Sequence, residues 1–145
     1  MPSATKKVTI SRRSVGRYVA TNARGGQIRL GTGEDADFTP VELLLAALGG
    51  CSSVDVDAVT SRRGEPTRFD VTIRGTKVED EQGRHSLHDL SLDFEVRFPD
   101  TEEGAQAQAL VGKVARISRD KDCTVSRTLE NASPVTFLVD GQELD

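Results

Sequence analysis

An apolar segment near residue 45 limits the folds that this sequence can adopt. Every residue from 41 to 48 is apolar except Glu42. As a helix, this segment carries apolar side chains around nearly its whole circumference, so its first two or three turns have almost no face for water. Because a chain of 145 residues supplies few other elements to cover it, we expect a second copy of the chain to provide part of the cover in a homodimer.

This helix has clear start and stop signals. Thr39 suits the N-cap position, Pro40 the first helical position, and Glu42 the partner position of a capping box. The helix is expected to end at about residue 63, because Gly64 and Pro66 follow there. A capping role explains Glu42 without any function.

Two glycines interrupt the helical pattern directly before a cysteine. Gly49 and Gly50 each cost about 1 kcal/mol relative to alanine inside a helix. Close packing of the helix against another element accounts for them. A need for free space beside Cys51 accounts for them equally well, and the sequence leaves both explanations open.

Strands are predicted on both sides of this helix. Residues 7–10, 17–21 and 27–30 alternate partially between apolar and polar and indicate a small antiparallel meander. After the helix, strict alternation over residues 69–74 and 89–98 predicts a half-buried pair of strands joined by a polar turn.

Two more helices and a final strand complete the predicted order. Apolar residues spaced at i, i+4 and i+7 predict an amphipathic helix that ends near Ser118. A short helix is expected over Cys123–Glu130 with Asp122 as its cap, and residues 134–139 are expected to form the last strand. Paired strands with helices grouped apart predict one α+β domain over residues 1–145.

Charge and composition exclude several functions. Nineteen basic residues against 23 acidic ones give a net charge of -4. The sequence has no basic stripe interleaved with aromatic residues, so we expect no nucleic-acid partner. No apolar stretch follows the first lysines as a secretory signal requires, and the apolar run is too short for a membrane span. We therefore expect a cytoplasmic protein with reduced thiols and no membrane partner.

The two cysteines have competing interpretations when only residue type is considered. A lone cysteine is most often a small buried hydrophobe. Cys51 lies more than two turns into its helix, where the helix dipole has faded, and Asp55 one turn later opposes a thiolate. A reactive Cys51 would need a nearby cation. Cys123 stands at a predicted helix start, where backbone N–H groups favour a thiolate.

Other common kinds of site are not supported. The cysteines lack the Cys-x-x-Cys spacing of a redox motif and are too few for a four-thiolate zinc site. His85 and His88 are three residues apart in a predicted strand, which places them on opposite faces. The glycines of Gly31–Gly33 are not followed by the third glycine of a dinucleotide site. We expect neither a metal nor a cofactor.

The segments around the cysteines carry a family resemblance. Residues 39–56, Thr-Pro-Val-Glu-Leu-Leu-Leu-Ala-Ala-Leu-Gly-Gly-Cys-Ser-Ser-Val-Asp-Val, together with residues 122–129, Asp-Cys-Thr-Val-Ser-Arg-Thr-Leu, resemble the OsmC/Ohr family of thiol peroxidases. The resemblance implies an intertwined dimer with antiparallel sheets wrapped around a long central helix. It also implies a cofactor-free peroxidase of oxidative stress defence, in which Cys51 attacks an organic hydroperoxide, Cys123 resolves the product as a disulfide, and a dithiol reductant restores both thiols.

The resemblance is closest to the YhfA-like branch of the family. In the Ohr branch a glutamate directly after the helix-opening proline and an arginine near the N-terminus hold the thiolate. This sequence has Val41 after the proline, so Glu42 and Arg17 are the candidates for those roles. The departure keeps an alternative open, namely a non-catalytic dimer that binds a small apolar ligand or senses thiol redox state.

Overall fold

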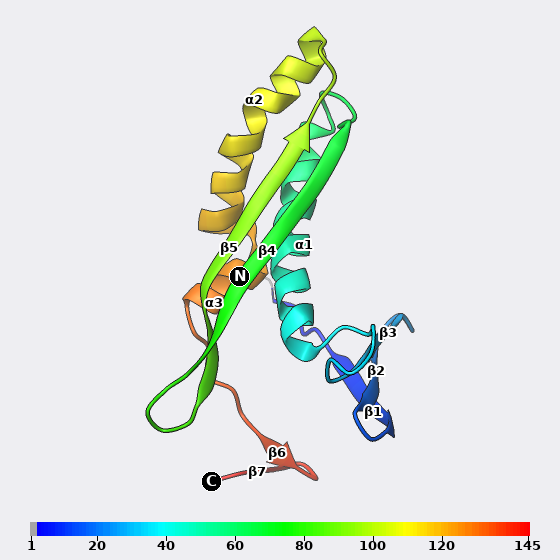
Figure 1. Ribbon diagram of the computed structural model, residues 1–145, viewed down its shortest axis with the longest axis vertical. Coiled ribbons are helices and arrows are strands. Elements are labelled where there is room, and N and C mark those ends of the chain that lie inside the picture. The colour runs from blue at the N-terminus through cyan, green and yellow to red at the C-terminus, as the bar shows by residue number, and fades with distance from the viewer. Residues whose placement is uncertain (1–2) are drawn as a thin grey trace. The chain divides into compact units, whose positions relative to one another are not determined.

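The computed structural model describes residues 3–145. The chain divides into two compact units, one up to residue 46 and one from residue 47 onward. Figure 1 shows the order of elements, with three strands before helix α1 (Pro40–Thr60), a long hairpin after it, and the remaining helices towards the C-terminus. The boundary between the units falls inside α1.

The first unit is an antiparallel meander followed by the start of α1. Its strands β1 (Val8–Ser14), β2 (Arg17–Asn22) and β3 (Gln27–Leu30) lie in the order β1-β2-β3, so the predicted meander is confirmed. The turn between β1 and β2 contains Gly16 with φ of +72°, a conformation in which glycine is favoured because it lacks a Cβ atom.

Helix α1 begins as predicted. The backbone N–H of Thr39 donates to Oε1 of Glu42 at 2.8 Å, and the N–H of Glu42 donates to Oγ1 of Thr39 at 3.2 Å, which is a complete capping box. The helix ends at Thr60, before the predicted residue 63. The difference arises because the N–H of Arg63 bonds to the carbonyl of Thr60, three residues back, and tightens the last turn.

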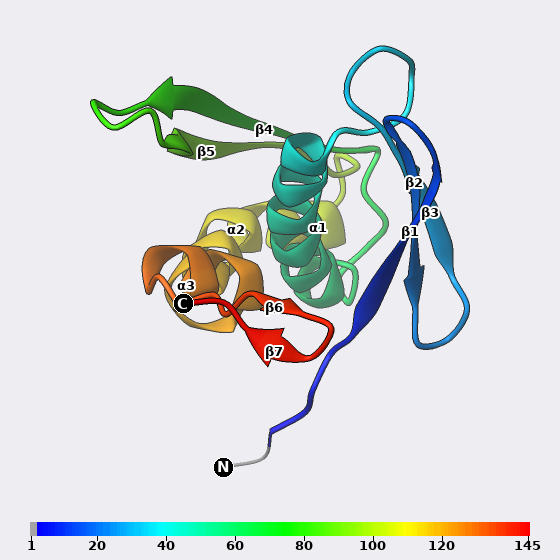
Figure 2. The same ribbon diagram turned by 90° about the horizontal axis from the view of Figure 1, so that it is seen from below.

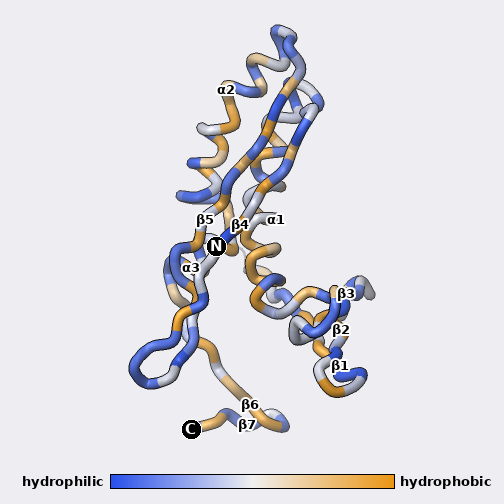
Figure 3. Tube along the Cα trace, viewed as in Figure 1, coloured by the Kyte–Doolittle hydropathy of each residue, from blue (hydrophilic) through white to orange (hydrophobic). Residues whose placement is uncertain are grey.

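A long hairpin opens the second unit after α1. Strands β4 (Arg68–Glu79) and β5 (His85–Arg97) pair in antiparallel register around a turn that begins at Asp80, which confirms the predicted strand pair and extends it at the turn end. Figure 3 shows the alternation of hydrophobic and hydrophilic residues along both strands. One face of the hairpin is therefore available for helices.

Helices α2 (Glu102–Ile117) and α3 (Thr124–Glu130) are joined by a π-helical turn, η1 (Ser118–Asp122). The predicted cap of α3 was wrong, because Cys123 and not Asp122 occupies the N-cap. Cys123 has extended backbone angles, and its Sγ atom accepts a hydrogen bond from the N–H of Ser126 at 3.4 Å. Asp122 instead ends the π-helical turn.

The last predicted strand was also wrong in its extent. Only Leu138–Val139 (β6) of residues 134–139 is a strand, and it pairs with Gln142–Glu143 (β7). The chain reverses between them at Asp140 and Gly141, which both have positive φ values, 47° and 81°. This tight turn pairs β6 with the residues that follow it, rather than with the long hairpin.

The helices of the second unit lie on one face of its hairpin. Figure 2 shows α1 and α2 on the same side of β4 and β5. A methyl group on Gly49 of α1 would meet Cδ1 of Ile73 on β4 and come within 2.6 Å of its Cγ1, so close packing explains this glycine. Nothing lies within 4 Å of the corresponding position on Gly50. The buried centre of this unit includes Val56, Val96 and Ala107.

One chain covers α1 only in part. The apolar side chains of Val41, Leu44 and Val54 stay exposed, with Val54 at 68%. The expected homodimer stays a prediction, since one chain carries no partner. With 21 residues, α1 is long and apolar enough to cross a membrane by length and composition alone. Core helices of soluble proteins meet the same two criteria.

Candidate active site

The second unit brings the two predicted cysteines together. Cys51 lies in α1 and Cys123 at the N-cap of α3, and the two thiols are close enough for each to shift the pKa of the other. Both are free thiols. Cys51 is half-buried, whereas Cys123 has no exposed surface. The site therefore combines a partly exposed thiol with a second thiol that is shielded from solvent.

Opposing influences act on the thiol of Cys51. Burial raises its pKa above the ordinary value, and the neighbouring Cys123 raises it further, because a second negative charge there is unfavourable. Backbone N–H groups of Val125 and Thr124, in the first turn of α3, act in the opposite direction by hydrogen bonding to the sulfur. The sequence analysis called for a nearby cation to stabilise a Cys51 thiolate, and no cation is among these largest influences on its pKa. The backbone N–H groups at the start of α3 supply part of that stabilisation instead.

Cys123 is the more acidic thiol of the pair. Burial alone would raise its pKa, but hydrogen bonds from the Ser52 hydroxyl, from the backbone N–H of Ser126 and from Cys51 outweigh burial and lower the pKa below its ordinary value. The two thiols interact, so they titrate as a pair and share the first negative charge unequally.

Hydroxyl groups continue from Cys123 into the interior. Ser52 lies beside Cys123 and lowers the pKa of its thiol. The Oγ atom of Ser118 is 3.1 Å from the Oγ atom of Ser52 and donates to Oδ2 of Asp55 at 2.7 Å. Ser52 and Ser118 are both buried. Asp55 therefore accepts a hydrogen bond from a buried hydroxyl, and its expected opposition to a Cys51 thiolate stays a prediction.

Sequence reasoning missed this cluster of hydroxyl groups. Ser52 and Asp55 are three residues apart in one helix, so a shared face was a visible signal. Ser118 offers no such signal, because 63 residues separate it from Asp55 and only the packing of η1 against α1 joins them.

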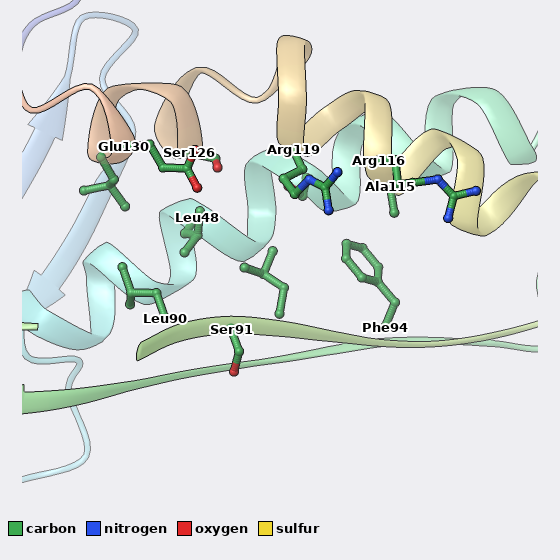
Figure 4. A pocket seen from close by; sticks show the side chains of 12 residues that line it. Leu48, Leu90, Ser91, Phe94, Ala115, Arg116, Arg119, Ser126 and Glu130 are labelled. Carbon is green, nitrogen blue, oxygen red and sulfur yellow. The ribbon is translucent and has the colours of Figure 1, made fainter. Parts of the chain in front are cut away.

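An apolar pocket adjoins the same cluster. It has a volume of about 340 Å³, and Ser52 forms part of its wall. Leu90, Leu92 and Phe94 line it from β5, and Arg116 and Arg119 line it from α2 and η1. Figure 4 shows Phe94 rising from the hairpin and Arg119 reaching in from the helical side. These arginines were not among the sequence candidates, which concentrated on the N-terminal strands.

Glu42 and Arg17 have local partners within the first unit. Glu42 completes the capping box with Thr39, and the guanidinium of Arg17 forms an ion pair with the carboxylate of Asp35. A role of either residue towards Cys51 stays a prediction. Within residues 3–145, no group of three or more histidine, cysteine or acidic side chains is arranged to hold a metal ion.

Comparison with known sequences yields one family. The sequence model described as OsmC-like protein matches residues 31–137. An uncharacterized protein of Mycobacterium tuberculosis (strain H37Rv) is 29% identical over 133 residues, which cover 90% of this chain and 93% of that protein. Protein YhfA of Escherichia coli (strain K12) is 29% identical over 120 residues, which cover 82% of this chain and 85% of YhfA.

Solved structures share the fold. A hypothetical protein from Aquifex aeolicus VF5 has a TM-score of 0.71 at 20% identity, covering 90% of this chain and 91% of its own. An OsmC-like protein of unknown function from Vibrio cholerae has a TM-score of 0.72 at 14% identity, covering 88% and 95%. An organic hydroperoxide resistance protein from Elizabethkingia anophelis has a TM-score of 0.53 at 14% identity, covering 83% and 91%.

Proposed function

Because the chain belongs to the OsmC-like protein family, we propose that it is a thiol-dependent peroxidase that reduces organic hydroperoxides through Cys51 and Cys123. The resemblance inferred from the cysteine motifs and the α+β OsmC-like fold are both confirmed. The structural relative from Elizabethkingia anophelis is named for organic hydroperoxide resistance. A peroxide-related stress function is consistent with that name.

The proximity of the two thiols carries this proposal. Seventy-two positions separate Cys51 from Cys123 along the chain, yet each thiol is close enough to shift the pKa of the other. In the proposed cycle the Cys51 thiolate attacks the O–O bond, an alcohol leaves, and Cys51 becomes a sulfenic acid. Cys123 then attacks the oxidised sulfur, a disulfide forms and water leaves. A dithiol reductant returns both cysteines to thiols.

The pocket beside Ser52 supports an apolar substrate. Its β5 wall consists of the leucine and phenylalanine side chains already described, which would lower the free energy of an organic hydroperoxide by removing its carbon chain from water. Hydrogen peroxide gains nothing from such a wall. We therefore expect organic hydroperoxides to react faster than hydrogen peroxide.

A homodimer completes the proposal. Exposed apolar residues of α1, including Val41, Leu44 and Val54, would be covered by a second copy of the chain. Sedimentation at micromolar concentration tests this directly, because a monomer alone would contradict it. A cytoplasmic location suits the chemistry, since cytoplasmic reductants keep such thiols reduced.

Peroxide consumption tests the proposed function. Wild type is mixed with cumene hydroperoxide and a dithiol reductant and compared with Cys51→Ser and Cys123→Ser. We expect Cys51→Ser to consume no more peroxide than buffer does. In Cys123→Ser treated with excess peroxide before the dithiol is added, we expect Cys51 to accumulate in sulfinic form, because no second thiol intercepts the sulfenic acid. Equal peroxide loss in wild type and Cys51→Ser would contradict the proposal.

The raised pKa of Cys51 favours a second candidate function. A thiol that ionises poorly is a slow nucleophile at neutral pH, which suits a dimer that senses redox state or binds a small apolar ligand in the pocket. Native mass spectrometry would then find a ligand that copurifies with the protein, and peroxide would leave both thiols unchanged.

A further inference from the structure

Cys123 must lose a proton while it is shielded from water. Its side chain has no exposed surface, and attack on an oxidised Cys51 requires the thiolate form. No proton can pass directly from a fully buried sulfur to solvent. The polar side chains that touch Cys123 must therefore accept that proton or pass it on.

We propose that Ser52, Ser118 and Asp55 form a proton relay that connects the buried sulfur of Cys123 to the surface. Ser52 lies close enough to Cys123 to lower the pKa of its thiol. The hydroxyl oxygen of Ser52 lies 3.1 Å from that of Ser118, and Ser118 donates to a carboxylate oxygen of Asp55 at 2.7 Å. The second of these two distances is within the range of a hydrogen bond between oxygen atoms, and the first is just above that range.

The relay has two states that differ only in the direction of its hydrogen bonds. In one, the Cys123 thiol donates to Ser52, Ser52 donates to Ser118, and Ser118 donates to the Asp55 carboxylate. In the other, Asp55 is protonated and every donation is reversed, so Cys123 is a thiolate. Each hydroxyl gains one proton as it gives up another, so neither serine changes its charge.

Asp55 forms the outer end of the relay. It is half-buried and lines a surface hollow of about 360 Å³, together with Lys113 of α2 and Asp122 of η1. Ser52 also lines the apolar pocket, together with Arg116, Arg119 and Glu130. A proton on Asp55 leaves to water through the hollow.

The use of this relay in the peroxide cycle rests on the proposed function. During resolution, the proton of Cys123 passes through the serines to Asp55, the thiolate attacks the Cys51 sulfenic sulfur, and the S–S bond forms as hydroxide leaves. The hydroxide takes up a proton from solvent while Asp55 releases one, so the products are the disulfide and one water molecule. The relay itself is tested without any peroxide.

The test uses 5,5′-dithiobis(2-nitrobenzoate), an aromatic disulfide that releases a coloured thiolate. Cys51 displaces the first coloured thiolate and forms a mixed disulfide. Cys123 then attacks Cys51 and displaces the second. Both releases are followed by absorbance over a range of pH. The first reports the reactivity of Cys51 and the integrity of the fold, and the second reports deprotonation and attack by Cys123.

Variants that break the relay should slow only the second release. We expect Ser118→Ala and Asp55→Asn to slow it by about 100-fold, the lower end of the effect of a positioned acid–base group. Its rate should then rise steadily with pH, because hydroxide must remove the proton. Ser118→Thr keeps a hydroxyl and should restore the wild-type pH profile.

Two neighbouring residues of α1 provide matched controls. The Ser53 hydroxyl donates to the Gly49 carbonyl instead of joining the relay, and Asp57 is exposed. Ser53→Ala and Asp57→Asn should leave both releases unchanged. Wild-type rates of the second release in Ser118→Ala and Asp55→Asn would overturn the relay, as would equal rates in Ser118→Ala and Ser118→Thr. A wild type that consumes no peroxide but passes this test would overturn only the proposed function.

Discussion

The two halves of α1 differ in what determines their surroundings. The first half begins with the capping box of Thr39 and Glu42, and the apolar side chains of Val41 and Leu44 remain exposed. The second half packs Gly49 against Ile73 of β4. It also places Cys51, Ser52 and Asp55 against η1 and α3.

The signals that start helix α1 and the contacts that give it a chemical site therefore lie in different halves of the helix. Local hydrogen bonds within four residues define where the first half begins. The second half acquires its chemistry from residues more than 60 positions later in the chain, which hydrogen-bond to its side chains. The same helix therefore contains one half that forms from local signals and another whose function depends on packing.

The largest expected effect concerns the two thiols in the second half. Cys123→Ser keeps an N-cap hydroxyl on α3 but removes the neighbouring thiol, so the pKa of Cys51 should fall relative to wild type. A larger fraction of Cys51 is then thiolate at neutral pH, and iodoacetamide should alkylate it faster. The thiolate absorbance of the variant, measured as the pH is raised, checks the direction.

Removing the other thiol should shift the pKa of the remaining cysteine in the opposite direction. Cys51→Ala removes a hydrogen bond that lowers the pKa of Cys123, so that pKa should rise. Shifts of the same sign in both variants would contradict the coupling between the two thiols. Val54→Ala serves as a control, because Val54 is exposed on the same half of α1.

An intermediate effect is expected for packing in the second half. Gly49→Ala forces a methyl group onto Ile73, and such overpacking costs about 1 to 3 kcal/mol, offset in part by the better helix propensity of alanine. Gly50→Ala meets no atom within 4 Å and should raise the free energy of unfolding by up to about 1 kcal/mol. Urea denaturation measures both variants.

Two outcomes of the urea experiment would contradict these predictions for Gly49 and Gly50. Equal stability of Gly49→Ala and wild type would show that Ile73 moves aside without cost. A destabilised Gly50→Ala whose unfolding depends on protein concentration would show that a partner subunit covers this position instead of water.

The smallest effect is expected at the first half of α1. Glu42→Ala should lower the free energy of unfolding by about 0.5 kcal/mol, because it removes one half of the capping box. Glu42→Gln keeps an acceptor for the Thr39 N–H and should be nearly neutral. Thermal unfolding measures both. We expect peroxide consumption to stay unchanged in Glu42→Gln, and a large loss there would assign the Glu42 charge to the chemistry of Cys51.

Sequence alone was sufficient for several features that depend on neighbours along the chain. The capping box, the meander and the alternation of the β4–β5 hairpin are all periodic or local patterns, and the structure has them where they were predicted. The cap of α3 and the last strand were predicted less well. Both depend on local backbone angles, at Cys123 and at the Asp140–Gly141 turn, which residue type specifies only loosely.

The sequence by itself determined that Cys51 and Cys123 were the residues to compare, since each lies within a recognisable motif. Only the tertiary structure decided that the two thiols lie close together, that Cys123 is the more acidic one, and that Ser118 joins Ser52 to Asp55. The physical reason is that hydrogen bonds and burial act over a few ångströms in space, while the residues that supply them here are dozens of positions apart along the chain.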